Sequence, residues 1–174
     1  MLQGQYEQAE QEFRSLLADR LRILGPDRPG TLATRNQIAR ALAARGQYEH
    51  AEQAFRDLLA DTLRIYGPDN ASTLAGRYEL TRVLAARGQY EQAEQQYRDQ
   101  LADRRRIEGP DHPNTLGVRY SIADVLAMRG QYEQAEHAFR DLLADRLRVL
   151  GPDHPDTRVT QESLTAVEHH TRPA

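Results

Sequence analysis

Apolar residues recur at helical spacing along the chain. In residues 31–45 the apolar positions are Leu32, Ile38, Ala39 and Leu42. In residues 47–66 they are Tyr48, Ala51, Phe55, Leu58 and Leu59. Both sets fall on one face of a helix with 3.6 residues per turn, and no β-rich alternating run interrupts them. The pattern therefore predicts an all-α chain in which two types of helix alternate.

Glycine and proline mark the expected helix ends. Gly46 follows the first-type helix 31–45, as a residue suited to the left-handed conformation at a helix C-terminus. Gly67 and Pro68 end the second-type helix 47–66, because proline cannot continue a helix. The chain opens on a second-type helix over 5–24, and the last first-type helix is expected to begin near Thr157. The prediction is about eight helices.

A repeat of 42 residues underlies this alternation. The string GQYE begins at Gly4, Gly46, Gly88 and Gly130, and GPD begins at Gly25, Gly67, Gly109 and Gly151. A dense pattern at constant period predicts stacked helix hairpins. We expect a single array over 1–174 with units 4–45, 46–87, 88–129 and 130–174. The polar segment 156–170 is expected to be a C-terminal capping helix, while the N-terminal side is expected to be unprotected.

Charged residues also recur with the repeat. Glu52 and Arg56 stand four residues apart, as do Glu10–Arg14, Glu94–Arg98 and Glu136–Arg140. Such pairs stabilise a helix by about 0.2–0.5 kcal/mol each. We expect them on the solvated face of the second-type helix.

The motif Gly46-x-Tyr48-x2-Ala51-x3-Phe55, preceded by Ala39 and Leu42, resembles the core signature of tetratricopeptide repeats. The long second helix and the GPDHP linker are similar to the kinesin-light-chain type, which also occurs in bacterial multidomain regulators. The resemblance implies an α-solenoid of stacked antiparallel helix hairpins, wound as a right-handed superhelix, that works as a protein-binding scaffold. Arg35, Arg77 and Arg119 depart from the family, which has large apolar residues there; we interpret them as structural arginines paired with acids.

The resemblance also implies that the first helix of each repeat lines a concave groove. By spacing, the varied polar and aromatic groove positions are Asn36, Arg40, Tyr78, Arg82, Tyr120 and Asp124. The tyrosines suit binding hot spots, and the arginines suit carboxylates. One hypothesis is a peptide or protein ligand with an acidic segment near Arg40 and Arg82. The alternative is that these residues only solvate an open face, or that Arg82 pairs with Asp124.

Composition narrows the function classes. The chain has 23 basic and 26 acidic residues, a net charge of −3, no Cys and no Lys. The interspersed charge gives no footprint for nucleic acid or a membrane surface. Without Lys, a P-loop and a Schiff-base site are excluded within this chain. His112 and His154 lie in linkers, where a turn role is favoured over metal binding.

These features favour a protein- or peptide-binding scaffold and not an enzyme. No catalytic residue, cofactor or metal is expected. Without a signal peptide or an apolar span in the sequence, a cytoplasmic protein is expected. Two alternatives stay open. One is self-assembly into a homo-oligomer through exposed solenoid ends, and the other is a sensor or autoinhibitory arm of a larger signalling protein.

Overall fold

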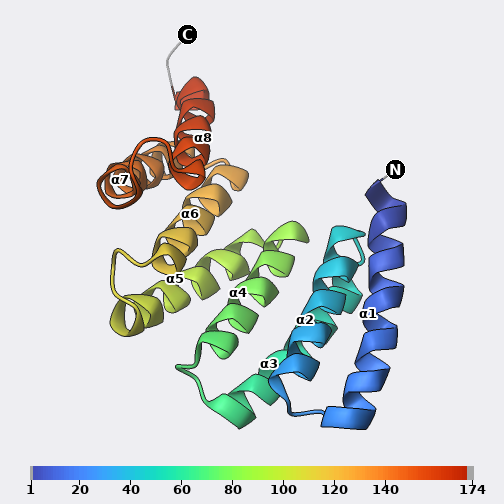
Figure 1. Cartoon of the computed structure of the whole chain (residues 1–174). Helices are drawn as coiled ribbons and strands as arrows, with labels where there is room; N and C mark the ends of the chain where they lie inside the picture. Colours follow the sequence, from blue (N-terminus) through green and yellow to red (C-terminus); the bar gives the residue numbers. More distant parts are fainter. Residues whose placement is uncertain (1, 172–174) are drawn as a thin grey trace. The chain divides into compact units, whose positions relative to one another are not determined.

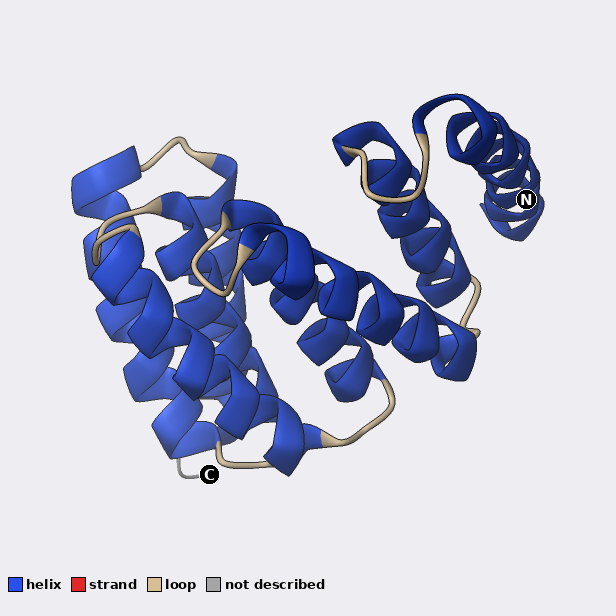
Figure 2. Cartoon of the chain, turned by 90° about the horizontal axis from the view of Figure 1, so that it is seen from below, coloured by secondary structure: helices blue, strands red, loops and turns tan. Residues whose placement is uncertain are grey.

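The computed structural model describes residues 2–171 (Figures 1 and 2). Within that range the regular elements are α1 (Leu2–Leu24), α2 (Pro29–Ala44), α3 (Tyr48–Tyr66), α4 (Ala71–Ala86), α5 (Tyr90–Ile107), α6 (Pro113–Met128), α7 (Tyr132–Leu150) and α8 (Pro155–Thr171). These eight helices, with no strand among the described residues, confirm the predicted all-α class. The predicted first-type helices are α2, α4, α6 and α8.

The helix boundaries differ from the predicted ones by a few residues. Helix α2 begins at Pro29 rather than Thr31, and α8 begins at Pro155 rather than Thr157. Proline suits the first helical position, because the N–H it lacks would have no partner inside the helix. After α2, Gly46 has φ 73°. The N–H of Gly46 donates to Ala43 O at 3.0 Å, and that of Gln47 to Leu42 O at 2.9 Å. This is the predicted glycine C-terminus.

The linkers position the starts of the first-type helices. At α4, Asn70 Oδ1 accepts a hydrogen bond from Ser72 N at 2.9 Å. At α6, His112 Nδ1 accepts from Asn114 N at 3.2 Å, and His154 Nδ1 accepts from Asp156 N at 3.2 Å. Each side chain satisfies a backbone donor that has no partner inside its helix. This confirms the predicted turn role of His112 and His154.

The chain forms two compact units, residues 1–87 and 88–174. In unit 1, α1 packs on α2, α2 on α3, and α3 on α4. In unit 2, α5 packs on α6, α6 on α7, and α7 on α8. The single continuous array over 1–174 stays a prediction.

Each unit has a core where second-type helices meet first-type helices. The core cluster of unit 1 contains Ala39, Leu42, Ala51, Phe55 and Val83. That of unit 2 contains Ala123, Leu126, Ala135, Phe139, Leu164 and Val167. Phe55 and Phe139 are essentially inaccessible to solvent. Full burial of such a side chain contributes about 1.5–3 kcal/mol. In unit 1 the sequence predicted the α2 and α3 members of this core, Ala39, Leu42, Ala51 and Phe55.

The expectation that the glutamates of these pairs lie on the solvated face of the second-type helix is wrong for Glu10, Glu52 and Glu94, which are buried. Glu52 is only 4% exposed. Its carboxylate pairs with Arg56 one turn later and also accepts a hydrogen bond from Arg87, which follows α4. A buried carboxylate needs such partners, because desolvation without them costs several kcal/mol. The four-residue spacing between Glu52 and Arg56 indicates their ion pair in the sequence. No such spacing indicates the contact with Arg87, which is 35 residues after Glu52.

A second charge network joins the GPD linker to the helices. In unit 1, Arg35 Nη1 donates to Asp61 Oδ2 at 2.6 Å, and Arg64 links Asp61 to Asp27 of the linker. In unit 2 the equivalent contacts are Arg119–Asp145, Arg148–Asp145 and Arg148–Asp111. The structural interpretation of Arg35 and Arg119 is therefore confirmed. The hydrogen bond from Arg35 holds the pKa of Asp61 below its ordinary value.

Helix α8 is amphipathic and packs on α7. It buries Thr157, Thr160, Leu164 and Val167. Its other face exposes polar residues, including Gln161 and Thr165. Thr165 stands two and three repeats after Thr81 and Ala39, which are both buried. Threonine is thus buried at position 81 and exposed at position 165, and the capping role of 156–170 stays a prediction.

Candidate functional site

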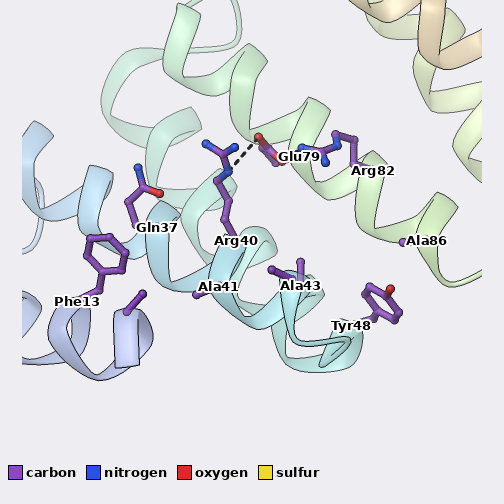
Figure 3. A pocket seen from close by; sticks show the side chains of 11 residues that line it. Phe13, Gln37, Arg40, Ala41, Ala43, Tyr48, Glu79, Arg82 and Ala86 are labelled. Atoms are coloured by element: carbon purple, nitrogen blue, oxygen red, sulfur yellow. Dashed lines mark hydrogen bonds and ion pairs between the residues drawn. The ribbon is translucent and has the colours of Figure 1, made fainter. Parts of the chain in front are cut away.

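Unit 1 holds a cavity of about 590 Å³ between first-type helices α2 and α4 (Figure 3). Helices α1 and α3 also contribute to its walls. The lining residues are Ala9, Phe13, Gln37, Arg40, Ala41, Ala43, Ala44, Tyr48, Glu79, Arg82 and Ala86. Five alanines leave the space open, because they carry no long side chain. The cavity is therefore lined by five small residues together with four polar or charged and two aromatic side chains.

Two arginines approach one glutamate in this cavity. Arg82 Nη1 lies 3.0 Å from Glu79 Oε2, on the same helix. Arg40 Nε, from α2, lies 3.7 Å from Glu79 Oε1, and the two side chains point toward each other in Figure 3. The arginine side chains are 52% and 53% exposed, whereas that of Glu79 is 17% exposed. The cluster thus presents two guanidinium groups to solvent against one carboxylate.

The walls beside this cluster are partly apolar. Phe13 of α1 and Tyr48 of α3 are both half-buried, and Ala41 is buried. Figure 3 shows Phe13 and Tyr48 on either side of Arg40 and Ala41. Gln37 adds an amide that can donate and accept hydrogen bonds. A ligand in this cavity can therefore meet positive charge, an amide and aromatic surface.

The structure places Arg40 and Arg82 in one cavity, whereas the predicted groove stays a prediction. Asn36 and Tyr78 lie on the same two helices and are half-buried, but they do not line this cavity. The lining positions of α4 are 79, 82 and 86, which are three and four residues apart. The cavity face therefore lies about one residue further round the helix than the predicted groove positions.

Sequence reasoning missed Glu79, Gln37 and Phe13. Glu79 had a visible signal, because it stands three residues before Arg82, a spacing that allows an ion pair on a helix. Gln37 had none beyond its place on a first-type helix. Phe13 is the repeat equivalent of Phe55, which belongs to the apolar stripe, and nothing in that pattern shows that Phe13 lines a cavity.

In unit 2, Tyr120 packs against other helices. Its ring lies edge-on to Phe139 with centroids 5.5 Å apart, and its hydroxyl is 2.9 Å from Ser163 Oγ of α8. The guanidinium carbon of Arg146 lies 5.4 Å from the ring centroid. Tyr120 therefore has a structural role in unit 2, whether or not it also contacts a ligand.

Asp124 is half-buried on α6, one turn after Tyr120. Desolvation raises its pKa above the ordinary value. Arg82 and Asp124 belong to different units, so their predicted alternative pairing stays a prediction. Within unit 1, Arg82 has Glu79 as its partner.

No group of three or more His, Asp or Glu side chains in residues 2–171 could hold a metal ion. Over the same range, no helix has the length and apolar character needed to cross a membrane.

The sequence of the chain also matches a known protein family. The sequence profile described as Tetratricopeptide repeat matches residues 1–64 and 72–147, well over half of the chain. No curated protein matches the chain.

Solved structures share the fold at low sequence identity. A crystal structure of nearly identical TPR-like repeats, described as a kinesin light chain of Podosopora anserina, has 24% identity and a TM-score of 0.75, covering 97% of this chain and 80% of that one. BtubC (BKLC) from P. vanneervenii has 20% identity and a TM-score of 0.77, covering 97% and 67%. A Rap protein complexed with competence and sporulation factor has 14% identity and a TM-score of 0.68, covering 95% and 48%.

At these identities the structural likeness establishes the fold alone. The neighbours confirm the predicted α-solenoid class, and the kinesin-light-chain structures agree with the predicted repeat type. Together with the profile match over both stretches, this settles the family. The chain belongs to the tetratricopeptide repeat family.

Proposed function

We propose that the protein is a peptide-binding scaffold, and that the cavity of unit 1 receives an acidic side chain of the bound peptide. Tetratricopeptide repeats generally serve as protein-interaction scaffolds and are typically non-enzymatic. The Rap neighbour, described as complexed with competence and sporulation factor, supports a binding role for this fold. The proposal for this chain depends on its own residues.

The observation that carries the proposal is the arrangement of Arg40 and Arg82 around Glu79. Both arginines are about half exposed, and Arg40 is 3.7 Å from its partner atom. Exposed ion pairs of this kind contribute only about 0–1 kcal/mol. A carboxylate from a ligand can therefore engage one guanidinium while Glu79 keeps the other, at little cost to the protein.

The walls of the cavity define the rest of the ligand. Phe13 and Tyr48 offer aromatic surface to an apolar side chain next to the acid. Asn36 and Tyr78, on the same two helices, are proposed to contact the peptide beyond the cavity. In unit 2, taken by itself, Tyr120 and Asp124 are the proposed contacts at the equivalent helix.

A display selection tests this proposal without a known partner. A random peptide library is panned on the immobilised 174-residue chain and on its Arg40→Glu/Arg82→Glu variant. We expect Asp and Glu to be enriched on the wild-type chain, next to an apolar residue, and to lose that enrichment on the variant. Selection of the same acidic peptides by both proteins would refute the proposed site.

The control is a variant with an equal change of net charge elsewhere. Arg22 and Arg158 are 71% and 63% exposed and pair with exposed aspartates. The Arg22→Glu/Arg158→Glu chain should select the same peptides as the wild type. This separates a local effect of Arg40 and Arg82 from a general effect of charge.

Self-association is a second candidate, because α1 exposes apolar side chains. Leu16 is 39% exposed, whereas Leu58 and Leu142, one and three repeats later, are 3% and 0% exposed. The polar outer face of α8 disfavours head-to-tail stacking, so this candidate is a symmetric dimer through α1. Light scattering should then show a dimer that Leu16→Glu converts to a monomer. A wild-type monomer at all concentrations would exclude it.

A further inference from the structure

Three arginines occupy equivalent positions in successive repeats of the chain. Residues 45, 87 and 129 are arginines that follow α2, α4 and α6. Each donates to a buried glutamate near the start of the preceding second-type helix and lies near a second glutamate one turn earlier. The pairs are Arg45 with Glu10 and Glu7, Arg87 with Glu52 and Glu49, and Arg129 with Glu94 and Glu91.

The fourth copy of this site has no such arginine. The equivalent residue is Thr171, whose hydroxyl donates to Glu136 Oε2 at 2.6 Å. Glu136 also pairs with Arg140, as its counterparts pair with their own arginines one turn later. Its side chain is 19% exposed, against 8%, 5% and 5% for Glu10, Glu52 and Glu94. The shorter threonine leaves this carboxylate more accessible.

The second glutamate of the fourth site is Glu133. In the other copies this residue lies 3.8, 3.1 and 3.2 Å from the guanidinium. Among residues 2–171, Glu133 has no ion pair or hydrogen bond. Within the described residues, Glu133 therefore lacks the arginine that three other repeats place at this position.

A cavity of about 290 Å³ lies at this place in unit 2. It is lined by Gly130, Gln131, Tyr132, Glu133, Gln134, His170 and Thr171. The rings of Tyr132 and His170 are stacked, with centroids 4.3 Å apart and planes 9° apart. A guanidinium group is planar and binds well against aromatic rings. The site thus combines an acidic group with one stacked aromatic pair.

We propose that this cavity is a slot for an arginine side chain of a partner polypeptide. The partner's guanidinium takes the place that Arg45, Arg87 and Arg129 take in the other three sites. Arginine is favoured over lysine, because the internal copies use two nitrogens of one planar group to reach two carboxylates. The slot shares no residue with the cavity of Arg40 and Arg82, so either proposal can fail alone.

Nuclear magnetic resonance can test the slot with a defined probe. The peptide acetyl-Gly-Arg-Gly-amide is titrated into the ¹⁵N-labelled 174-residue chain, and the same peptide with lysine or citrulline is the comparison. We expect shifts at the amides of residues 132–134 and 170–171 with the arginine peptide, weaker shifts with lysine, and none with neutral citrulline. Equal shifts with all three peptides, or none with arginine, would overturn the proposal.

Substitutions that fill the slot, or that create a second one, provide a further test. Thr171→Arg should fill the slot from within and abolish the shifts, and Glu133→Gln should weaken binding about threefold to fivefold, as expected for an exposed ion pair. Conversely, Arg129→Thr should create a second slot, with new shifts near Glu91 and Glu94. Unchanged binding by the Thr171→Arg chain would rule out the slot.

The chain's own Arg172 is the competing occupant, because it follows Thr171 in the sequence. The titration is therefore repeated on the Arg172→Ala variant. Equal binding by the wild-type and variant chains supports a partner's arginine. Binding by the variant alone would show that Arg172 fills the slot, and this would overturn the proposal.

Discussion

Arg87 donates a hydrogen bond to the buried carboxylate of Glu52, although the two residues are 35 positions apart in the sequence. The contact joins the turn after α4 to the start of α3. It recurs as Arg45–Glu10 in unit 1 and Arg129–Glu94 in unit 2. Each of these pairs links the C-terminal end of a first-type helix to the second-type helix that precedes it in the chain.

Replacing Arg87 by Met should therefore destabilise unit 1. The methionine keeps most of the apolar stem but leaves Glu52 buried with only Arg56 as its partner. Breaking a buried pair in this way costs about 3–5 kcal/mol, and we expect a loss near the lower end of that range. Urea unfolding followed by circular dichroism measures it. The matched Arg56→Met variant, at a site 54% exposed, should lose less than about 1 kcal/mol. Equal losses would contradict the role given to Arg87.

Acid should weaken the Arg35–Asp61 and Arg119–Asp145 pairs. The arginine hydrogen bonds lower the pKa of both aspartates in the folded state from the ordinary value of 3.8. An acid whose folded-state pKa is lowered stabilises the fold above its unfolded-state pKa, and that contribution disappears as the pH falls through the folded-state value. The free energy of unfolding should fall below about pH 4. An Asp61→Asn/Asp145→Asn chain should be less stable at pH 7 and show a shallower fall. An unchanged pH dependence would contradict the assignment.

The contribution of Asp124 to the free energy of unfolding should change with pH in the opposite direction. Desolvation raises its pKa in the folded state, so the folded protein binds its proton more readily than the unfolded chain does. Stability then decreases as the pH rises past the unfolded-state value. Asp124→Asn should raise the free energy of unfolding at pH 7 by up to about 1 kcal/mol, and the gain should vanish near pH 3. Thermal unfolding at the two pH values checks this, and a loss of stability at pH 7 would show that Asp124 has a favourable partner.

The hydroxyl of Tyr120 should contribute to the packing of α8. Tyr120→Phe removes its hydrogen bond with Ser163 and should cost about 0.5–1.5 kcal/mol. Ser163→Ala should cost a similar amount, and the double variant little more than either single one. Additive losses in urea unfolding would argue against the bond. Tyr120→Phe is also the cleaner variant for binding studies, because Tyr120→Ala would remove the contact with Phe139 as well.

The fold could be predicted because its information is local and repeated. Gly46, Phe55 and Ala51 recur in equivalent places, and the spacing of apolar residues identifies the helices. The buried state of Glu52 could not be predicted, because it depends on Arg87 in the next hairpin. Such pairing between distant residues leaves no signal in helical periodicity.

The candidate site was predictable only in part. Arg40 and Arg82 follow from the helix type, and Glu79 could have been found from its spacing to Arg82. Which residues of α2 and α4 face the cavity could not be predicted. A shift of the lining positions by one residue depends on how the two helices pack. The slot at Thr171 had a sequence signal, since aligning the repeats places Thr171 with Arg45, Arg87 and Arg129. The cavity beside Glu133 needed the structure.

Binding of one acidic peptide tests the central claim most directly. A peptide selected on the wild-type chain is titrated by isothermal calorimetry into the wild type, the Arg40→Glu/Arg82→Glu variant and the Arg22→Glu/Arg158→Glu control. The double charge reversal replaces attraction by repulsion at two exposed sites, each change contributing about 1 kcal/mol, so the dissociation constant should rise roughly tenfold for the Arg40/Arg82 variant. The control should bind like the wild type. Equal affinity of all three chains for the peptide would contradict the proposed role of the Arg40–Glu79–Arg82 cavity.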